Sequence, residues 1–187
     1  MIGKPIDKRI IPTDAVIIRE SNIFVYLCFA DCIPFTLYDK KQKIMAFAHL
    51  GWQIIELKLQ TKLLKIFLNE YKSNIEDLII YLGPSIKYKS YILENPLQLK
   101  YDDWKPFLHK LSGDKYQIDL NGYIVNCLKH EGLKEEQINI DKVDTAKNNN
   151  FFSHYRCVYI NKEGEEGRFI YGAGMIDYLS SIVFLFL

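Results

Sequence analysis

The segment Ala30-Asp31-Cys32-Ile33-Pro34 is followed, after a short hydrophobic run, by Ala48-His49-Leu50-Gly51-Trp52. Each segment lies at one end of a run of apolar residues that is typical of a strand. A thiolate and an imidazole at the ends of two neighbouring strands are ligand types for a divalent zinc or copper ion. They are equally the groups of a cysteine nucleophile and its base. We therefore expect the functional site around Cys32 and His49.

Runs of β-branched and aromatic residues around these segments predict strands over residues 14–19, 24–29, 34–38 and 43–48. The polar residues 39–42 suit a hairpin turn between the last two strands. Apolar residues recur at helical spacing over residues 54–71, which predicts one long helix. A second helix is predicted over residues 119–130, with Gly132 just beyond its end.

The remaining segments predict a mixture of strands and loops. Residues 78–82 read as a buried strand that Gly83-Pro84 ends, and residues 138–143 alternate as a strand. Strand-like composition returns at residues 151–156 and 168–171, whereas residues 95–116 predict irregular or partly helical structure. The apolar run 178–187 reads as a terminal strand or helix. These elements favour the α/β (α+β) class, a mixed-sheet sandwich with flanking helices.

Length and composition restrict the class of protein. The 187 residues fit a single domain over residues 1–187, and 24 basic against 23 acidic side chains do not favour nucleic acid as a partner. The four cysteines show no disulfide framework, so we expect a cytoplasmic protein. We expect neither a signal peptide nor a membrane span, because the apolar runs are too short.

Two features favour function over a merely structural role for Cys32 and His49, although cysteine is often buried and a lone histidine is often structural. Asp31 places a charge at the end of an apolar strand, where a core would not tolerate it without a partner or solvent. His49 precedes Gly51, whose missing side chain permits close approach of a ligand to the backbone.

The two segments resemble the "ADCxP … HAGWRG" signature of the laccase-domain family, also called multicopper polyphenol oxidoreductases and regarded as purine nucleoside phosphorylases. Further segments agree with the family in order. They are Thr13-Asp14-Ala15 ("gDA"), Leu82-Gly83-Pro84-Ser85-Ile86 ("IGPsI"), Tyr91, Asp119-Leu120 with Asn126 and Leu128, Phe151-Phe152-Ser153-His154 ("FFSxR") and Gly167-Arg168 ("GR"). The resemblance extends from about Asp14 to Arg168.

The resemblance implies a cytoplasmic, zinc-dependent enzyme with a mixed α/β sandwich and a His, Cys, His metal site. It implies phosphorolysis of adenosine, inosine, guanosine or methylthioadenosine, together with deamination of adenosine. The matching metal ligands are Cys32 and His49. The family's first histidine belongs to a "QvHG" motif upstream of the "gDA" strand, and only thirteen residues precede Asp14 here. We therefore expect a chain that is N-terminally short relative to the family.

The chain departs from the family pattern mainly at anion contacts. Gln53 and Ile54 replace the arginine and glycine after the tryptophan, and Tyr155 replaces the first arginine after "FFSH". An arginine at such a site would be a bidentate phosphate donor. His154, His109 and His130 are the remaining histidines, of which His154 aligns with a variable position and is expected to line a pocket or to be structural.

The predicted catalytic residues are Cys32, His49 and Asp31, the last as a partner of the metal ligands or a proton carrier. Gly51, Ser85 and Arg168 are the predicted substrate-binding residues, with Arg168 as an anion contact and purine nucleoside and phosphate as the partners. Two alternatives remain: a metal-free cysteine hydrolase using Cys32 and His49, and a degenerate, non-catalytic family member. Copper is less favoured than zinc, because a multicopper centre needs more than the four histidines present.

Overall fold

The central element is a five-stranded sheet. The computed structural model describes residues 13–161, 166–176 and 181–186, the last segment as backbone only. The strand order is β1 (Ala15–Ile18), β4 (Ile44–Leu50), β3 (Ile33–Asp39), β5 (Leu78–Leu82) and β9 (Ile138–Ile140). All neighbours are antiparallel except the parallel pair β5 and β9. The predicted hairpin is present as β3 and β4, which pair along their whole length.

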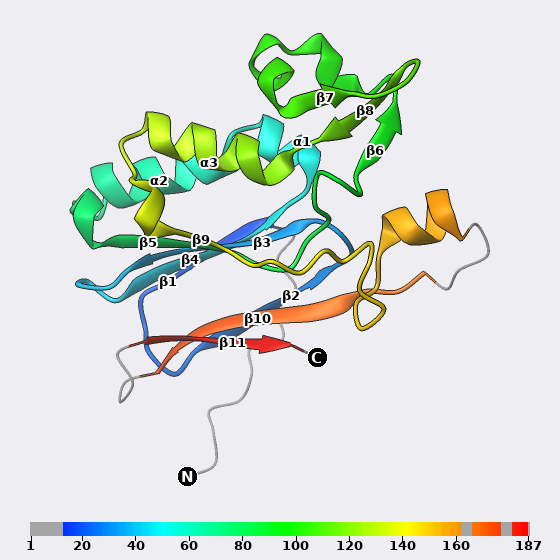
Figure 1. Cartoon of the computed structure of the whole chain (residues 1–187). Coiled ribbons are helices and arrows are strands. Elements are labelled where there is room, and N and C mark those ends of the chain that lie inside the picture. Colours follow the sequence, from blue (N-terminus) through cyan, green and yellow to red (C-terminus); the bar gives the residue numbers. More distant parts are fainter. Residues whose placement is uncertain (1–12, 162–165, 177–180, 187) are drawn as a thin grey trace.

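Helices and a second sheet cover opposite faces of this sheet (Figure 1). On one face lie α1 (Trp52–Glu56), α2 (Leu59–Asn69) and α3 (Leu120–His130). On the other lies an antiparallel sheet in the order β11 (Ser181–Phe186), β10 (Phe169–Ile176) and β2 (Phe24–Phe29). The expected mixed-sheet sandwich with flanking helices is confirmed.

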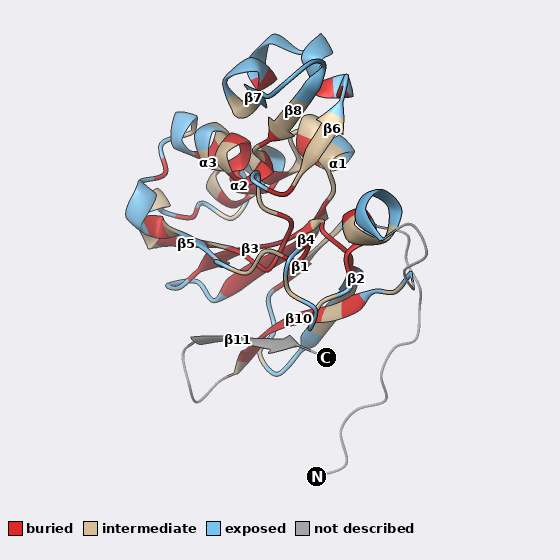
Figure 2. Ribbon diagram, turned by 45° about the vertical axis from the view of Figure 1, so that its right-hand side comes forward, coloured by how far each residue is buried: buried red, intermediate tan, exposed pale blue. Residues whose placement is uncertain are grey.

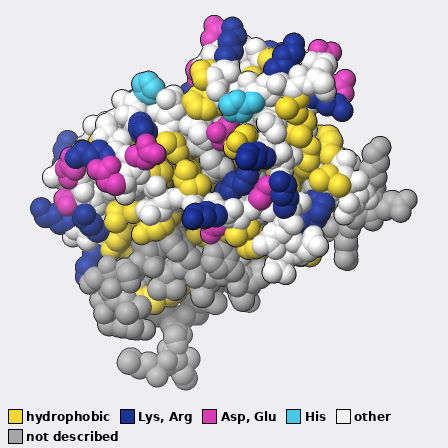
Figure 3. Space-filling model, in the orientation of Figure 1, with side chains coloured by type: hydrophobic (Ala, Val, Ile, Leu, Met, Phe, Trp, Pro, Cys, Tyr) yellow, Lys and Arg dark blue, Asp and Glu magenta, His cyan; other side chains and the backbone are white. Residues whose placement is uncertain are grey.

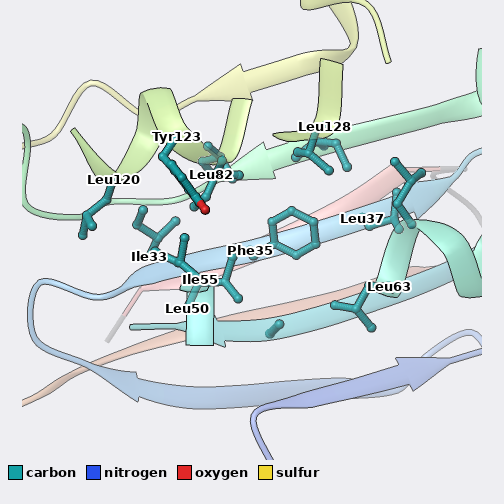
Figure 4. Packing of buried hydrophobic residues seen from close by; sticks show 14 of the residues in the cluster. Ile33, Phe35, Leu37, Leu50, Ile55, Leu63, Leu82, Leu120, Tyr123 and Leu128 are labelled. Atoms are coloured by element: carbon teal, nitrogen blue, oxygen red, sulfur yellow. The ribbon is translucent and has the colours of Figure 1, made fainter. Parts of the chain in front are cut away.

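Side chains of the hairpin alternate between two cores, as the period of a strand requires. Phe35 and Leu37 of β3 point toward the helices, where they meet Leu63 of α2 and Leu128 of α3 (Figure 4). On the opposite face, residues such as Phe47 pack against the three-stranded sheet. Both strands are therefore buried on both faces, as the colouring of Figure 2 shows.

The predicted single helix over residues 54–71 is two helices, α1 and α2. The chain turns between them at Lys58, which has a left-handed backbone with φ 60°. The Lys58 ammonium lies 2.5 Å from the carboxylate of Asp103 and also contacts the hydroxyl of Tyr123. These distant partners fix a break that helical spacing of apolar residues cannot reveal.

Three other predictions differ from the structure. Residues 92–118 contain an unpredicted small sheet, in which β8 (Lys115–Ile118) pairs with both β6 (Ile92–Glu94) and β7 (Leu108–Lys110). The strand predicted over residues 138–143 is confined to β9. Residues 151–156 are not a strand: they lead into a short π-helix, Arg156–Ile160. The 3₁₀ helices are Ile75–Asp77, Leu97–Lys100, Asp102–Phe107 and Glu135–Gln137.

Within the described residues, no helix has both the length and the apolar character that crossing a membrane requires.

Candidate functional site

A cavity of about 280 Å³ lies where the start of β3 meets the end of β4. Asp31, Cys32 and Gly51 contribute to one wall, and Tyr91, Tyr155 and Tyr159 form another. Gly51 lies close to Cys32: a Cβ atom at this glycine would lie 3.4 Å from Cys32 Sγ. A longer side chain at position 51 would therefore fill the space in front of the thiol.

The Cys32 thiol is held in its protonated form. Burial raises its pKa to about 11, the negative charge of Asp31 adds to this, and the positive charge of Arg168 acts in the opposite direction. The thiol is therefore protonated at neutral pH in the absence of a further cation. A metal ion bound to the sulfur would reverse this balance.

Asp31 ties the wall of the cavity to a distant part of the chain. Its buried carboxylate accepts hydrogen bonds from Thr145 Oγ1 (2.6 Å), Ser153 Oγ (3.0 Å) and the backbone N–H of Tyr155 (2.7 Å). Its backbone has a φ of 80°, which the short polar side chain of aspartate tolerates better than most. With three donors bound, the carboxylate acts as a positioning group for Cys32 and Tyr155.

Arg156 fixes the same distant segment from the other side. Its guanidinium donates to the backbone carbonyls of Thr145 (2.8 Å) and Phe151 (2.6 Å). The segment that follows β9 is thereby folded onto itself before it reaches the cavity. Arg156 is thus committed to main-chain contacts in this structure.

The tyrosine wall is an aromatic cluster. The rings of Tyr155 and Tyr159 stack with centroids 4.9 Å apart, and Tyr91 meets Tyr155 edge to face at 5.9 Å. Burial raises the pKa of the Tyr91 hydroxyl, with the nearby Cys32 as the next cause. The wall therefore presents aromatic surface, which suits a planar ligand.

His49 lies on the same side of the hairpin as Cys32. It pairs with Pro34 across the hairpin, and its ring packs edge-on against Phe29 at 5.1 Å, facing the three-stranded sheet. Its Nδ1 is 3.7 Å from a carboxylate oxygen of Asp14. Among the described residues, Cys32 lines the cavity and His49 does not.

The other predicted site residues are spread around this cavity. Gly51 lines it, whereas Ser85 is fully buried beside it and accepts a hydrogen bond from Lys87 Nζ at 3.0 Å. Arg168 is exposed and donates a hydrogen bond to the carbonyl of Gly167. Its positive charge nevertheless acts to lower the pKa of Cys32. His154 lines the cavity, and its Nδ1 lies 3.0 Å from a carboxylate oxygen of Glu166.

Lys87 gives a pH-dependent prediction. Burial lowers the pKa of its ammonium from 10.5 to about 8, although Asp141, Asp144 and Asp119 oppose the shift. Between about pH 8 and 10.5 the unfolded chain holds this proton and the folded chain does not, so stability from this residue rises with pH. Below pH 8 the ammonium is protonated in both the folded and the unfolded state, so the full cost of burying its charge lowers the free energy of unfolding. Lys87→Met should therefore stabilise the protein by about 1 kcal/mol at pH 7, after discounting for solvent screening and the lost Ser85 contact.

Urea denaturation at pH 7, 8 and 9 measures this effect as the difference between wild type and variant. Taking the difference cancels the opposite trend of Cys32, whose raised pKa reduces stability above about pH 9 in both proteins. The exposed Lys89→Met is the matched control. Parallel stability curves for Lys87→Met and wild type would contradict the prediction.

Several cavity residues lie outside the predicted site. They are Trp52, Leu93 and Tyr159. The spacing of four residues between Tyr155 and Tyr159 was the available signal, because such residues share one face of a helical turn. This helical spacing conflicts with the predicted strand over residues 151–156 and agrees with the π-helix in the structure.

The described residues supply part of a metal site. Cys32 and His49 are suitable ligand types on one side of the hairpin, but no group of three or more His, Cys, Asp or Glu side chains that could hold a metal ion occurs among the described residues. A catalytic zinc site commonly has three protein ligands. These residues alone therefore do not complete such a site.

The fold and the site define the class of protein: a layered α/β protein with a cysteine-lined cavity beside a β-hairpin. The sequence profile of the family described as multi-copper polyphenol oxidoreductase laccase matches residues 3–176. The chain belongs to this family.

Curated relatives and solved structures agree with this assignment. The chain is 29% identical over 169 residues to purine nucleoside phosphorylase YlmD of Bacillus subtilis, covering 87% of this chain and 59% of that protein. It is 27% identical over 161 residues to purine nucleoside phosphorylase SA1030 of Staphylococcus aureus, covering 84% and 58%. The chain thus spans less than two thirds of the length of these relatives.

The crystal structure of Bacillus licheniformis hypothetical protein YfiH has a TM-score of 0.74 and 26% identity, covering 87% of this chain and 61% of that one. The structure of YlmD from Geobacillus stearothermophilus has a TM-score of 0.76 at 21% identity, covering 88% and 61%, and supports the fold.

Proposed function

We propose that this protein is a purine nucleoside phosphorylase, a glycosyl-transferring enzyme. The observation that carries the proposal is the cavity itself, in which Cys32 and Gly51 form one wall and three tyrosines another. Support also comes from the names of the curated relatives, which are purine nucleoside phosphorylases. The proposed substrates are adenosine, inosine, guanosine or methylthioadenosine, with phosphate.

The chemistry assigns a separate task to each wall. The tyrosine wall offers aromatic faces to the planar purine. Arg168 is the proposed contact for phosphate, because its charge already reaches Cys32. A phosphate oxygen attacks C1′ of the sugar and the bond from C1′ to the purine breaks. The bonding pair leaves with the base, which takes up a proton, and the sugar 1-phosphate is the second product.

Zinc is the metal we propose, with Cys32 and His49 as ligands, and copper is less favoured. Zinc supplies Lewis acidity that polarises an oxygen bound to it. Because the described residues offer only these two ligands, no step above is routed through the metal. Deamination of adenosine is a proposed second reaction of the same cavity. Water adds to C6 of the purine, the bond from C6 to the amino nitrogen breaks, and ammonia and inosine are the products.

The geometry gives less support to a metal-free cysteine hydrolase. A cysteine nucleophile needs a lowered pKa, supplied by an adjacent cation or base. Here burial and Asp31 raise the pKa of Cys32 to about 11, and the His49 ring packs against Phe29. The phosphorylase proposal does not require a free thiolate.

An assay of adenosine and inosine, with and without phosphate, tests the proposal. We expect phosphate-dependent release of the free base, and a fall in kcat/KM of at least about a hundredfold in Cys32→Ala and in His49→Ala. Loss of a metal ligand should reduce kcat/KM more than loss of a residue that hydrogen-bonds to a metal ligand. Cys28→Ala on β2 and His130→Ala at the end of α3 are controls, because both side chains are exposed.

Zinc analysis of the same preparations separates the alternatives. Stoichiometric zinc that is lost in both site variants supports the proposal, whereas an active, zinc-free enzyme that alkylating agents inactivate supports the hydrolase. Turnover that does not depend on phosphate would contradict phosphorolysis. A folded wild-type protein without activity on any nucleoside indicates a non-catalytic family member.

A further inference from the structure

A second cavity adjoins the one at Cys32. It has a volume of about 430 Å³ and is lined by Ile92, Leu93, Glu94, Leu111 and Lys115 together with Tyr155 and Tyr159. Leu93, Tyr155 and Tyr159 line both cavities. In Figure 3, hydrophobic side chains gather at the right of the molecule, between the lobe that carries β6 and β8 and the π-helix. The two cavities therefore share one wall.

The shared wall has a fixed part and an exposed part. The Tyr155 hydroxyl donates to the carbonyl of Ile92 at 2.8 Å and accepts from its N–H at 3.3 Å, so this ring is held in place. Tyr159 stacks on it but is 55% exposed. A ligand lying against Tyr159 can thus contact surface on both sides of the wall.

The second cavity is suited to an uncharged, apolar group. Ile92, Leu93 and Leu111 provide aliphatic surface, and the two aromatic rings complete it. Its two charged residues, Glu94 and Lys115, are exposed and opposite in sign. They are register partners in the antiparallel pair of β6 and β8. Ligand cavities commonly measure about 300–1,000 Å³, and the Cys32 cavity alone, at about 280 Å³, lies just below that range. With its neighbour it falls well inside the range.

We propose that the second cavity binds an apolar substituent on the base of a purine nucleoside whose base and sugar occupy the first cavity. This inference rests on the proposed function. In the proposed complex the reacting C1′ atom lies beside Cys32, and the planar base packs against the tyrosine rings. A group attached to the base, such as an N6-benzyl or N6-alkyl group on adenosine, then continues past Tyr159 toward Leu111. A substituent on the sugar's 5′ carbon remains on the Cys32 side of the wall.

Calorimetric titration with adenosine, N6-benzyladenosine and 5′-methylthioadenosine tests this inference. We expect N6-benzyladenosine to bind about tenfold more tightly than adenosine, because the added ring buries apolar surface. Leu111→Asp should reduce this advantage to within about twofold and leave adenosine binding unchanged. Leu99→Asp is the control, because Leu99 is 37% exposed and Leu111 40%, while only Leu111 lines the second cavity.

The possible outcomes separate the inference from the proposed function. If adenosine binds and the benzyl group gives no advantage, the inference is wrong and the proposed function is unaffected. The same holds if the methylthio group gives the larger gain, or if Leu111→Asp weakens both adenosines equally. If no nucleoside binds to the folded protein, the proposed function fails and the inference fails with it.

Discussion

Replacing Asp31 with alanine is expected to lower the free energy of unfolding by about 4 kcal/mol. The substitution removes the acceptor of three hydrogen bonds, those from Thr145, Ser153 and the backbone of Tyr155. A hydrogen bond to a charged group contributes about 1.5–3 kcal/mol, and a buried donor without a partner is costly. Alanine is also less tolerant of the left-handed backbone at this position, where φ is 80°.

Asp31→Asn separates hydrogen bonding from backbone strain. Asparagine keeps the shape of the side chain and tolerates the same backbone, but its amide nitrogen would face a donor instead of accepting from it. We expect roughly half the loss seen in the alanine variant. Urea denaturation measures both, with the exposed Asp114→Ala as the control. A free energy of unfolding for Asp31→Ala within about 1 kcal/mol of wild type would contradict the positioning role.

Replacing Trp104 with alanine is the second large expected effect, a loss of about 4 kcal/mol. Trp104 is fully buried, and its ring stacks on Tyr123 at 3.8 Å and 5°. Its indole N–H donates to the carboxylate of Glu56. The residue therefore joins the 3₁₀ helix Asp102–Phe107 to both α1 and α3. Its removal leaves a cavity at this junction and an unpaired carboxylate.

Thermal and urea denaturation of two companion variants distinguish the contributions at Trp104. Trp104→Phe retains an aromatic ring but loses the N–H donor and part of the volume, so we expect a loss of about 2 kcal/mol. Tyr101→Ala, 38% exposed, should cost less than 1 kcal/mol if burial decides the outcome. Equal losses at Tyr101 and Trp104 would show that burial does not account for the effect.

The hairpin and its flanking strands could be predicted because their signals are local. β3 and β4 are continuous apolar runs around one polar turn, and α3 has periodic apolar residues with a cap at Asp119 and a stop at Gly132. The break between α1 and α2 could not be predicted, because Lys58 leaves the helix for partners forty-five and sixty-five residues away. The short strands β6, β7 and β8 could not be predicted, because Pro96, Pro106 and Gly113 interrupt the segment that contains them and leave no continuous run of strand-forming residues.

The candidate site likewise has a part that could be predicted from local motifs and a part that could not. Cys32, Asp31 and Gly51 were predicted from motifs, and the structure places them together on one wall of the cavity. The partners of the Asp31 carboxylate and the aromatic pair Tyr155 and Tyr159 come from distant residues 145–159, of which 151–156 lead into a π-helix and do not form the predicted strand. The roles of these residues depend on tertiary contacts that a single sequence does not display.

The hydrogen bonds of Asp31 also bear on the order in which the protein folds. They join residues separated by 114, 122 and 124 positions, whereas β3 and β4 pair across one short turn. Contacts between remote segments form later because a long loop must first close. During synthesis from the N-terminus, Cys32 emerges more than a hundred residues before the donors that hold its neighbour. We therefore expect the nascent hairpin to form early, with its cysteine in an unfinished pocket until the C-terminal third of the chain leaves the ribosome.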